Sequence, residues 1–378
     1  MNVLLYLKHF PAAGAPLRVS TNKAVHGLAA GLAANGADVT VLCEGNAEGC
    51  RAAEAGYTIR CFATRAPYYT LRVAPGLRAF LESAPRRPSL AVLNGIFHPS
   101  VYALSRQLRK HGIPYVVAPH GPYHPLLFRK KPFLKWPYWY LLERRLLKQA
   151  RAIQFLDARQ ALWSRQLGID GGVVETPNGF AAAELIPESE LKWRADGPVR
   201  LLYWGRLDLH IKGLDLLIQA FERLRCTVDA RLVLQGPDWF GDGQAVVDFV
   251  RRSRAAEHIE IRPPVFDQPA ARVLGEHDIV CTPSRFEGFG LATLDAMLAA
   301  RVALVTESAG ITPYVVASEC GTVVTPDVDA IHGGLLALVQ RRAEWREMGL
   351  RGRTCAVESL NWNAIAHRTL TQYQHLLN

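Results

Sequence analysis

The sequence predicts an α/β fold of two tandem doubly wound, Rossmann-like domains that face each other across a cleft. The chain has 378 residues, 49% of them hydrophobic, which is enough for two globular domains. Short β-branched runs alternate with helical patterns, which is typical of parallel sheets covered on both faces. The alternation restarts after the loop-like segment 178–198. We therefore expect the domain boundary there.

The first domain, residues 1–180, is expected to start with the strand NVLLYL and an Ala-rich helix over 21–35. A second helical pattern covers 99–111. The other expected strands read DVTVLC, YTIRCF, SLAVLNG, IPYVVA, AIQFL and GVVETP. In open parallel sheets ligands bind beyond the carboxyl ends of the strands, so the segments that follow these strands hold the candidate site residues.

The second domain, residues 181–357, repeats the pattern. Its expected strands read VRLLYWG, ARLVLQG, IEIRPP, DIVCTPS, VALVTE and GTVVTP, with helices over 213–225, 243–255 and 291–300. The remaining segment, 358–378, is predicted as a C-terminal helix that packs back toward the N-terminal domain.

Charge is distributed unevenly along the chain. Residues 1–180 hold 23 Lys and Arg against 9 Asp and Glu, whereas residues 181–378 hold 21 against 25. The first domain is therefore expected to face an anionic partner. The negative charge of this partner is compatible with nucleic acid, an anionic membrane or a phosphorylated acceptor.

Cysteine content and hydropathy argue against a zinc-binding, disulfide-rich or membrane-spanning protein. Seven cysteines without a C-x-x-C pair argue against a zinc site and against a disulfide framework. No run approaches the roughly 18 apolar residues of a membrane span, and the start MNVLLYLKHF lacks the features of a signal peptide. We expect a cytosolic protein.

The second domain opens on a segment suited to binding a diphosphate, YWGRLDLHIKGLDLLIQAF. A strand ends at Gly205, Arg206 follows it, and Lys212 and Gly213 open a helix. Two cations beside a helix N-terminus can neutralise a diphosphate while backbone amides bind its oxygens. The segment alone also allows Arg206 and Lys212 to be solvated loop charges.

A second segment, SRFEGFGLATLDAM, places Glu287 in a glycine-containing turn and Asp295 in the following helix. Glycine allows tight backbone angles and a close ligand approach. The helix N-terminus attracts phosphates and polarised hydroxyls. Alternatively, Glu287 stabilises the helix dipole and Asp295 faces solvent.

Together, GRLDLHIKGLDLLIQAF, PSRFEGFGLATLDAM and VVETPNGF resemble the motifs of the family 4 retaining glycosyltransferases with the GT-B fold. The similarity covers residues 199–327 well and the first domain more loosely. The resemblance implies transfer of a sugar from a UDP- or GDP-sugar to a glycan or lipid-linked acceptor in polysaccharide or glycolipid biosynthesis. It implies no metal and no cofactor beyond this donor.

The resemblance also assigns roles to individual residues. Arg206 and Lys212 would hold the donor diphosphate. Glu287, the first acid of the E-x7-E signature, would contact hydroxyls of the donor sugar, and Asp295 would bind the ribose. Further donor contacts would come from Gly205 and from the backbone of Gly288, Phe289, Gly290 and Leu291.

The sequence departs from the family pattern in two places. Asp295 replaces the second Glu, which shortens the side chain but keeps two acceptor oxygens for a ribose diol. Ala300 and Val302 stand where the family has glycine and proline, and this change is expected to affect a turn more than the chemistry.

In the first domain, IPYVVAPHGPYHP ends a strand at His120 and Gly121. The resembling enzymes often have His or Arg followed by Gly here, which implies that His120 makes a polar contact to the donor or transition state. A histidine that caps a turn is the alternative, and His124 is a weaker candidate.

The loop HFPAAGAPLRVS lies between the first strand and the first helix. By resemblance, Gly14 would lie near the donor and Arg18 on the acceptor side. The loop lacks the G-x-G-x-x-G of a dinucleotide site, which argues against a dehydrogenase.

Two further patterns have structural explanations beside functional ones. DVD at 327–329 resembles a metal-binding D-x-D, but it precedes a helical pattern, and we interpret Asp327 as an N-cap. Segment 128–149 interleaves basic residues with Phe, Tyr and Trp, which suits core packing or a bilayer interface. We expect peripheral membrane contact there and assign to the acceptor or membrane side the residues Arg129, Lys130, Lys131 and Lys135.

Two other function classes remain. A nucleotide-sugar epimerase of the same fold would need carboxylates for acid and base chemistry, and the nine acids of the first domain form no obvious motif. A non-enzymatic basic binding protein would explain the charge but not the spacing of Arg206, Lys212 and Glu287. We expect no nucleic-acid partner.

Overall fold

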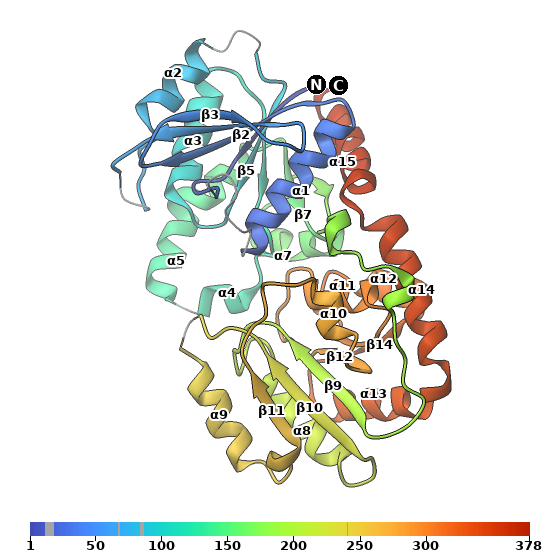
Figure 1. Ribbon diagram of the computed structural model, residues 1–378. Helices are drawn as coiled ribbons and strands as arrows, with labels where there is room; N and C mark the ends of the chain where they lie inside the picture. Colours follow the sequence, from blue (N-terminus) through green and yellow to red (C-terminus); the bar gives the residue numbers. More distant parts are fainter. Residues whose placement is uncertain (12–18, 67–68, 84–86, 130, 240) are drawn as a thin grey trace. The chain divides into compact units, whose positions relative to one another are not determined.

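The computed structural model describes residues 1–11, 19–66, 69–83, 87–129, 131–239 and 241–378 (Figure 1). The chain divides into two compact units. Unit 1 comprises Met1–Gly179 and Trp362–Asn378, and unit 2 comprises Phe180–Asn361. Each unit is built on one largely parallel sheet with helices on both faces. The predicted pair of doubly wound α/β domains is confirmed.

Unit 1 contains an eight-stranded sheet of order β3-β4-β2-β1-β5-β6-β7-β8. All its neighbouring strands are parallel except β3 and β4. The strands are β1 (Asn2–Tyr6), β2 (Asp38–Gly45), β3 (Gly49–Ala52), β4 (Thr58–Ala63), β5 (Leu90–Asn94), β6 (Tyr115–Ala118), β7 (Ala152–Phe155) and β8 (Gly172–Glu175).

Alternate residues of β1 enter two separate cores. Val3 and Leu5 pack with α1 (Ser20–Ala34) and α15 (Trp362–Leu377) on one face. Leu4 and Tyr6 pack on the other face with α2 (Pro75–Ser83) and α3 (Pro99–Lys110). Both faces of this strand are thus buried, as expected for a parallel sheet.

The chain between β6 and β8 of unit 1 is largely helical. It forms α4 (Pro125–Arg129), α5 (Pro132–Tyr138), the π-helix η1 (Trp139–Glu143), α6 (Arg144–Lys148), the 3₁₀-helix η2 (Ala158–Gln160) and α7 (Ala161–Gln166). Phe128 and Trp139 are buried in the same core as α2 and α3. This core therefore anchors the basic and aromatic segment 128–149.

The C-terminal helix α15 packs against α1 of unit 1. A Cβ on Gly27 would overlap the indole of Trp362, and one on Gly31 would lie 2.7 Å from Ala366 Cβ. Only residues as small as glycine allow this approach of the two helices. Of the segment 358–378, the helix and Asn378 belong to unit 1, and 358–361 belong to unit 2.

Unit 2 contains a six-stranded parallel sheet of order β11-β10-β9-β12-β13-β14. The strands are β9 (Val199–Trp204), β10 (Ala230–Gln235), β11 (Ile259–Arg262), β12 (Ile279–Thr282), β13 (Val302–Thr306) and β14 (Gly321–Val324). The helices are α8 (Leu214–Leu224), α9 (Gly243–Arg252), α10 (Ala270–Leu274), α11 (Leu291–Leu298), α12 (Thr312–Ser318), α13 (Val328–Gln340) and α14 (Trp345–Ser359).

Three details of unit 2 differ from the sequence pattern or refine it. Most of the loop-like segment 178–198 belongs to unit 2, where Ile186 and Leu191 are buried against Leu202. The helix expected over 243–255 ends at Arg252, because Ser253 has extended backbone angles. Ala300 has φ 51°, a left-handed conformation that glycine adopts more easily, so the family's missing glycine does affect a turn.

Candidate functional site

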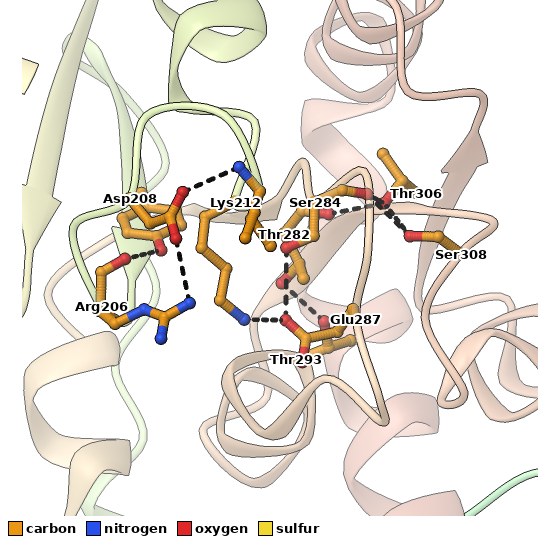
Figure 2. Close-up of polar contacts among 11 residues, drawn as sticks. Arg206, Asp208, Lys212, Thr282, Ser284, Glu287, Thr293, Thr306 and Ser308 are labelled. Carbon is orange, nitrogen blue, oxygen red and sulfur yellow. Dashed lines mark hydrogen bonds and ion pairs between the residues drawn. The ribbon is translucent and has the colours of Figure 1, made fainter. Parts of the chain in front are cut away.

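The carboxyl ends of two neighbouring strands of unit 2 carry the candidate site. Strand β9 pairs with β12, so the segment after Trp204 and the segment after Thr282 leave the sheet side by side. The first carries Arg206 and Lys212, and the second carries Glu287 (Figure 2). In open parallel sheets this edge is where ligands bind.

Lys212 and Glu287 join the two segments directly. Figure 2 shows the contact, in which Lys212 Nζ donates to Glu287 Oε2. The distance is 2.5 Å, and the two side chains are 20% and 17% exposed. The Ser284 hydroxyl donates to the same oxygen at 3.3 Å. Within the described part of the chain no donor contacts Glu287 Oε1, so this oxygen can accept a ligand hydroxyl.

Arg206 is held at the start of the first segment. Its guanidinium donates to Asp208 Oδ2 at 3.1 Å, and its carbonyl oxygen accepts from the Tyr203 hydroxyl at 2.5 Å. Burial raises the pKa of Tyr203, and the nearby Glu287 carboxylate adds to this effect. Tyr203 therefore stays neutral and fixes the backbone that presents Arg206.

A bidentate ion pair also connects the two segments. Arg285 donates to Asp215 Oδ1 at 2.6 Å and to Oδ2 at 2.8 Å, and to the His210 carbonyl at 2.8 Å. The Arg285 amide donates to Ile211 O at 3.0 Å. Planar two-point pairs fix orientation as well as distance. This pair therefore positions the segment of Lys212 against that of Glu287.

Glycines allow the backbone to pass closely at this edge. Gly213, the N-cap of α8, has φ 67°, and a Cβ there would overlap the Pro283 carbonyl. Gly290, the N-cap of α11, has φ 104°, and its Cβ would lie 3.0 Å from Ile311 Cγ2. Gly236 approaches the Gly205 carbonyl too closely for any side chain. The N-cap position of each helix, α8 and α11, therefore fits only glycine without backbone strain.

The start of α11 offers backbone donors beside Glu287. The N–H groups of Leu291 and Ala292 make no hydrogen bond within the described part of the chain. Phe289 is 2% exposed and packs edge-on against Tyr314, so its backbone rather than its ring can meet a ligand. Gly288 and Asp295 are half-buried.

Hydroxyl groups beneath the segment from Pro283 to Gly290 fix its path. The Thr306 and Ser308 hydroxyls donate to the Ser284 carbonyl at 2.6 Å and 2.7 Å (Figure 2). Thr282 and Thr293 hydroxyls lie 2.9 Å apart in the core. These contacts tie β12, β13 and α11 together under Glu287.

In unit 1, His120 lies beyond the carboxyl end of β6. Its Nε2 is 2.8 Å from Asn94 Oδ1, and Asn94 Nδ2 donates to the Tyr6 carbonyl at 3.0 Å. Because Asn94 Oδ1 can only accept, Nε2 carries the proton and Nδ1 is left to accept. Desolvation lowers the pKa of His120 to about 4, so the ring is neutral at neutral pH.

The other histidine candidate has a structural role. His124 Nδ1 accepts from the Leu126 amide at 3.2 Å, and its ring packs edge-on against Trp163 with centroids 4.4 Å apart. These contacts are those of a turn-capping histidine.

Of the residues assigned to the acceptor or membrane side, Arg129 ends α4, Lys131 is the N-cap of α5 and Lys135 lies within α5. Arg129 and Lys131 are exposed, whereas Lys135 donates to the Leu127 carbonyl at 2.5 Å and covers the Phe97 ring. Lys135 is therefore engaged in packing rather than free for a ligand. Gly14, Arg18 and Lys130 lie outside the described residues. No helix in the described part is long and apolar enough to cross a bilayer.

The interpretation of DVD as a helix cap is confirmed. Asp327 is the N-cap of α13, and its carboxylate accepts from the Ala330 amide at 2.8 Å. Asp329 pairs with Arg223 at the helix surface.

The arrangement in unit 2 can bind an anion beside hydroxyl groups. Arg206 and Lys212 supply positive charge, the start of α11 supplies backbone donors, and Glu287 Oε1 supplies an acceptor. Such a set suits a phosphate that is attached to a polyhydroxylated group.

The sequence did not single out several residues that position this site. They are Tyr203, Asp208, Asp215, Gly236, Ser284, Arg285, Thr306 and Ser308. Five of them stand inside the two quoted motifs: Tyr203, Asp208 and Asp215 in the first, and Ser284 and Arg285 in the second. The pairing of Arg285 with Asp215 had no signal in the sequence, because 70 residues separate them.

Comparison with known proteins identifies both halves of the chain. Residues 21–179 match the family described as "Glycosyl transferase 4-like domain", and residues 198–341 match "Glycosyl transferases group 1". The MMP alpha-(1->4)-mannosyltransferase of Mycolicibacterium hassiacum is 26% identical over 291 residues, which span 71% of this chain and 67% of the relative.

Solved structures share the fold over the whole chain. Sucrose-phosphate synthase from Thermosynechococcus elongatus superposes with a TM-score of 0.77 at 17% identity, covering 99% of this chain and 98% of that one. HepE of Anabaena, solved with UDP-glucose, gives a TM-score of 0.71 at 15% identity, with coverage of 99% and 100%. With both halves matched and the fold shared, the chain belongs to the family 4 glycosyltransferases with the GT-B fold.

Proposed function

We propose that this glycosyltransferase moves a sugar from a UDP- or GDP-sugar to a glycan or lipid-linked acceptor, with retention of anomeric configuration and without a metal ion. The observation that carries the proposal is the meeting of Arg206, Lys212 and Glu287 at the carboxyl ends of β9 and β12. The structure of Anabaena HepE with UDP-glucose supports a nucleotide-sugar donor for a chain of this fold.

In this proposal the positive charges act on the leaving group. As the bond from the anomeric carbon to the diphosphate breaks, negative charge grows on the diphosphate, and Arg206 and Lys212 would stabilise it. The donor diphosphate would compete with Glu287 for Lys212 Nζ. Glu287 would then accept from hydroxyls of the donor sugar, and Asp295 would bind the ribose.

Retention would follow from attack on the face that the diphosphate leaves. The departing phosphate oxygen would take the proton of the acceptor hydroxyl, so no protein base is assigned. The neutral His120 would supply a polar contact to the substrate, since its Nδ1 can accept from a sugar hydroxyl.

We also propose that the enzyme works in the cytosol against the inner face of a membrane. The large apolar residues Phe133, Leu134, Tyr140 and Leu141 on α5 and η1 are each at least 63% exposed. Exposed Arg129 and Lys131 flank them. Apolar side chains beside cations suit an anionic bilayer surface, where a lipid-linked acceptor would be presented.

Thermal unfolding with nucleoside diphosphates tests the donor site. A ligand of the native state raises the unfolding midpoint by mass action. We expect UDP or GDP to raise the midpoint of the wild type, and Lys212→Ala to lose most of this shift. Lys192→Ala, which removes an exposed lysine of the same unit, is the control and should keep the shift.

If neither nucleotide stabilises the wild type, or if Lys212→Ala responds as the Lys192→Ala control does, the donor site is not where we propose it. ADP and NAD serve as further ligands in the same experiment. Stabilisation by NAD alone would contradict a nucleotide-sugar donor.

A further inference from the structure

One cavity of unit 1 has a strongly cationic lining. It measures about 800 Å³ and lies between the segment after β4, the start of α2 and the exposed side of α3. Pockets for small ligands commonly have this size. Its lining includes four arginines: Arg65, Arg72, Arg78 and Arg106.

None of the described lining residues is acidic, and none of the four arginines forms an ion pair within the described part of the chain. The carboxylates of Glu48 and Glu82 lie on or beside α2. Glu48 lies against Gly76 at the start of α2, and Glu82 is 3.9 Å from Lys110. Four like charges around one cavity repel each other, and an anion would relieve this repulsion.

Two hydroxyl groups of the lining are oriented by the backbone. Thr64 Oγ1 accepts from the Ala66 amide at 3.1 Å, and Thr70 Oγ1 accepts from the Arg72 amide at 3.2 Å. Each hydroxyl therefore keeps its own hydrogen for donation. Hydroxyl and guanidinium donors together match the oxygens of a phosphate or carboxylate.

The cavity is separate from the position of His120. It lies beside the end of β4, whereas His120 follows β6, and β2, β1 and β5 lie between these strands. At about 4.8 Å per strand spacing, the ends of β4 and β6 are on the order of 20 Å apart. A group bound at the β4 side of the cavity, against Arg65 and Arg72, is thus several sugar lengths away from a group that contacts His120.

From this placement we infer that the cavity binds an anionic group of the acceptor, a phosphate or a sugar carboxylate located away from the hydroxyl that receives the new sugar. The inference rests on the proposed glycosyl transfer and adds a substrate class to it. The acceptor is then an acidic or phosphorylated saccharide that extends over several sugar units.

Calorimetric titration with inorganic phosphate and, separately, with glucuronate tests the inference. Whichever of UDP and GDP raises the unfolding midpoint of the wild type is present at saturation, so that the proposed donor site is occupied. We expect one of the two anions to bind the wild type, and the double variant Arg72→Ala/Arg106→Ala to bind it at least tenfold more weakly. Arg109→Ala removes an exposed arginine of the same helix outside the cavity and should change the affinity less than twofold.

Binding of phosphate would identify a phosphorylated acceptor, and binding of glucuronate an acidic sugar. Binding of neither anion, or equal binding by the wild type and the double variant, would overturn the inference. The thermal shift with the chosen nucleotide is measured on the same samples. If the double variant keeps that shift, a loss of anion binding concerns the cavity alone; if the wild type shows no shift with UDP or GDP, the proposed function fails instead.

Discussion

Glu143 is an acidic residue whose environment disfavours its charged form. It is fully buried at the end of the π-helix η1, and burial raises its pKa to about 7. The Tyr123 hydroxyl donates to Glu143 Oε1 at 2.7 Å, and the Phe97 amide donates to the same oxygen at 3.2 Å. Glu143 Oε2 has no partner within the described residues. A neutral carboxyl group suits this site better than a carboxylate.

This burial predicts a pH-dependent stability that one substitution removes. Between pH 4.5 and about 7 the unfolded chain releases the proton of Glu143 while the folded chain retains it. The free energy of unfolding should therefore fall as the pH rises through this range, by on the order of 3 kcal/mol. Glu143→Gln keeps the accepting oxygen but cannot ionise, so it should be the more stable protein above pH 7.

Urea unfolding of both proteins at pH 5 and pH 8 measures the effect. The difference between wild type and Glu143→Gln isolates Glu143 from the other groups that titrate in this range. An equal fall in stability for both proteins would show that Glu143 is not its source.

At the scale of elements, α5 and η1 combine a buried side with an exposed one. Trp139 is 1% exposed, whereas Phe133 is 82% and Leu141 is 70% exposed. Trp136 stacks on Phe128 and on Tyr140, with ring centroids 4.4 Å and 5.9 Å apart. The exposed apolar side is thus held on a base of stacked aromatic rings.

Sedimentation with vesicles tests the proposed membrane contact of α5 and η1. We expect the wild type to bind vesicles that contain anionic lipid, with weaker binding at high salt. Phe133→Ser/Leu141→Ser should weaken binding by about tenfold or more, because each residue contributes roughly 1.5 to 3 kcal/mol when its side chain leaves water. Leu162→Ser/Val316→Ser, which replaces residues that are 56% and 63% exposed elsewhere, is the control. Equal binding by the two double variants would contradict the assignment.

The elements that the sequence predicted are those with a strong period or a motif. Strands such as β1 and β12 are largely apolar runs, and α8 and α11 each follow a glycine within their motif. The short strand β3 was not predicted, because GCRA has no apolar pattern and pairs only at the sheet edge. The π-helix η1 ends at Glu143, which is held by Tyr123 and Phe97, and the bidentate ion pair joins Arg285 to Asp215. Both features depend on contacts between residues far apart in the sequence, so local patterns do not predict them.

For the candidate site, the motifs predicted which charged residues take part but not which of them contact each other. The motifs named Arg206, Lys212 and Glu287 separately. The contact between Lys212 and Glu287 arises because β9 and β12 are neighbours in the sheet, although β10 and β11 lie between them in sequence. Strand order is a property of the whole sheet, so local patterns could not supply this contact.

At the scale of the molecule, unit 1 is assembled from both ends of the chain. Helix α15 contacts α1, β7 and β8 through specific pairs: Asn363 Oδ1 accepts from Asn35 at 2.8 Å, and the Thr369 and Thr176 hydroxyls lie 3.1 Å apart. The Tyr373 hydroxyl donates to Gln154 in the core. The last 17 residues thus complete the hydrophobic core of a unit that begins at Met1.

Two Gly→Ala substitutions distinguish the effect of the packing between α1 and α15 on stability from the effect of helix propensity. Alanine favours a helix over glycine by about 0.8 to 1 kcal/mol, so Gly333→Ala, exposed on α13 with no neighbour within 4 Å of its Cβ, should stabilise the protein by about that amount. Gly31→Ala on α1 gains the same propensity, but its Cβ would lie 2.7 Å from Ala366 Cβ. Overpacking costs about 1 to 3 kcal/mol, so a net loss of stability is expected.

Thermal unfolding compares the two variants, and hydrogen exchange locates the change. Gly31→Ala should speed exchange of the α15 amides, whereas Gly333→Ala should leave them as in the wild type, because α13 belongs to unit 2. Stabilisation of equal size by both substitutions would show that α1 and α15 can separate without cost. In that case the end of the chain would not be needed to hold unit 1 together.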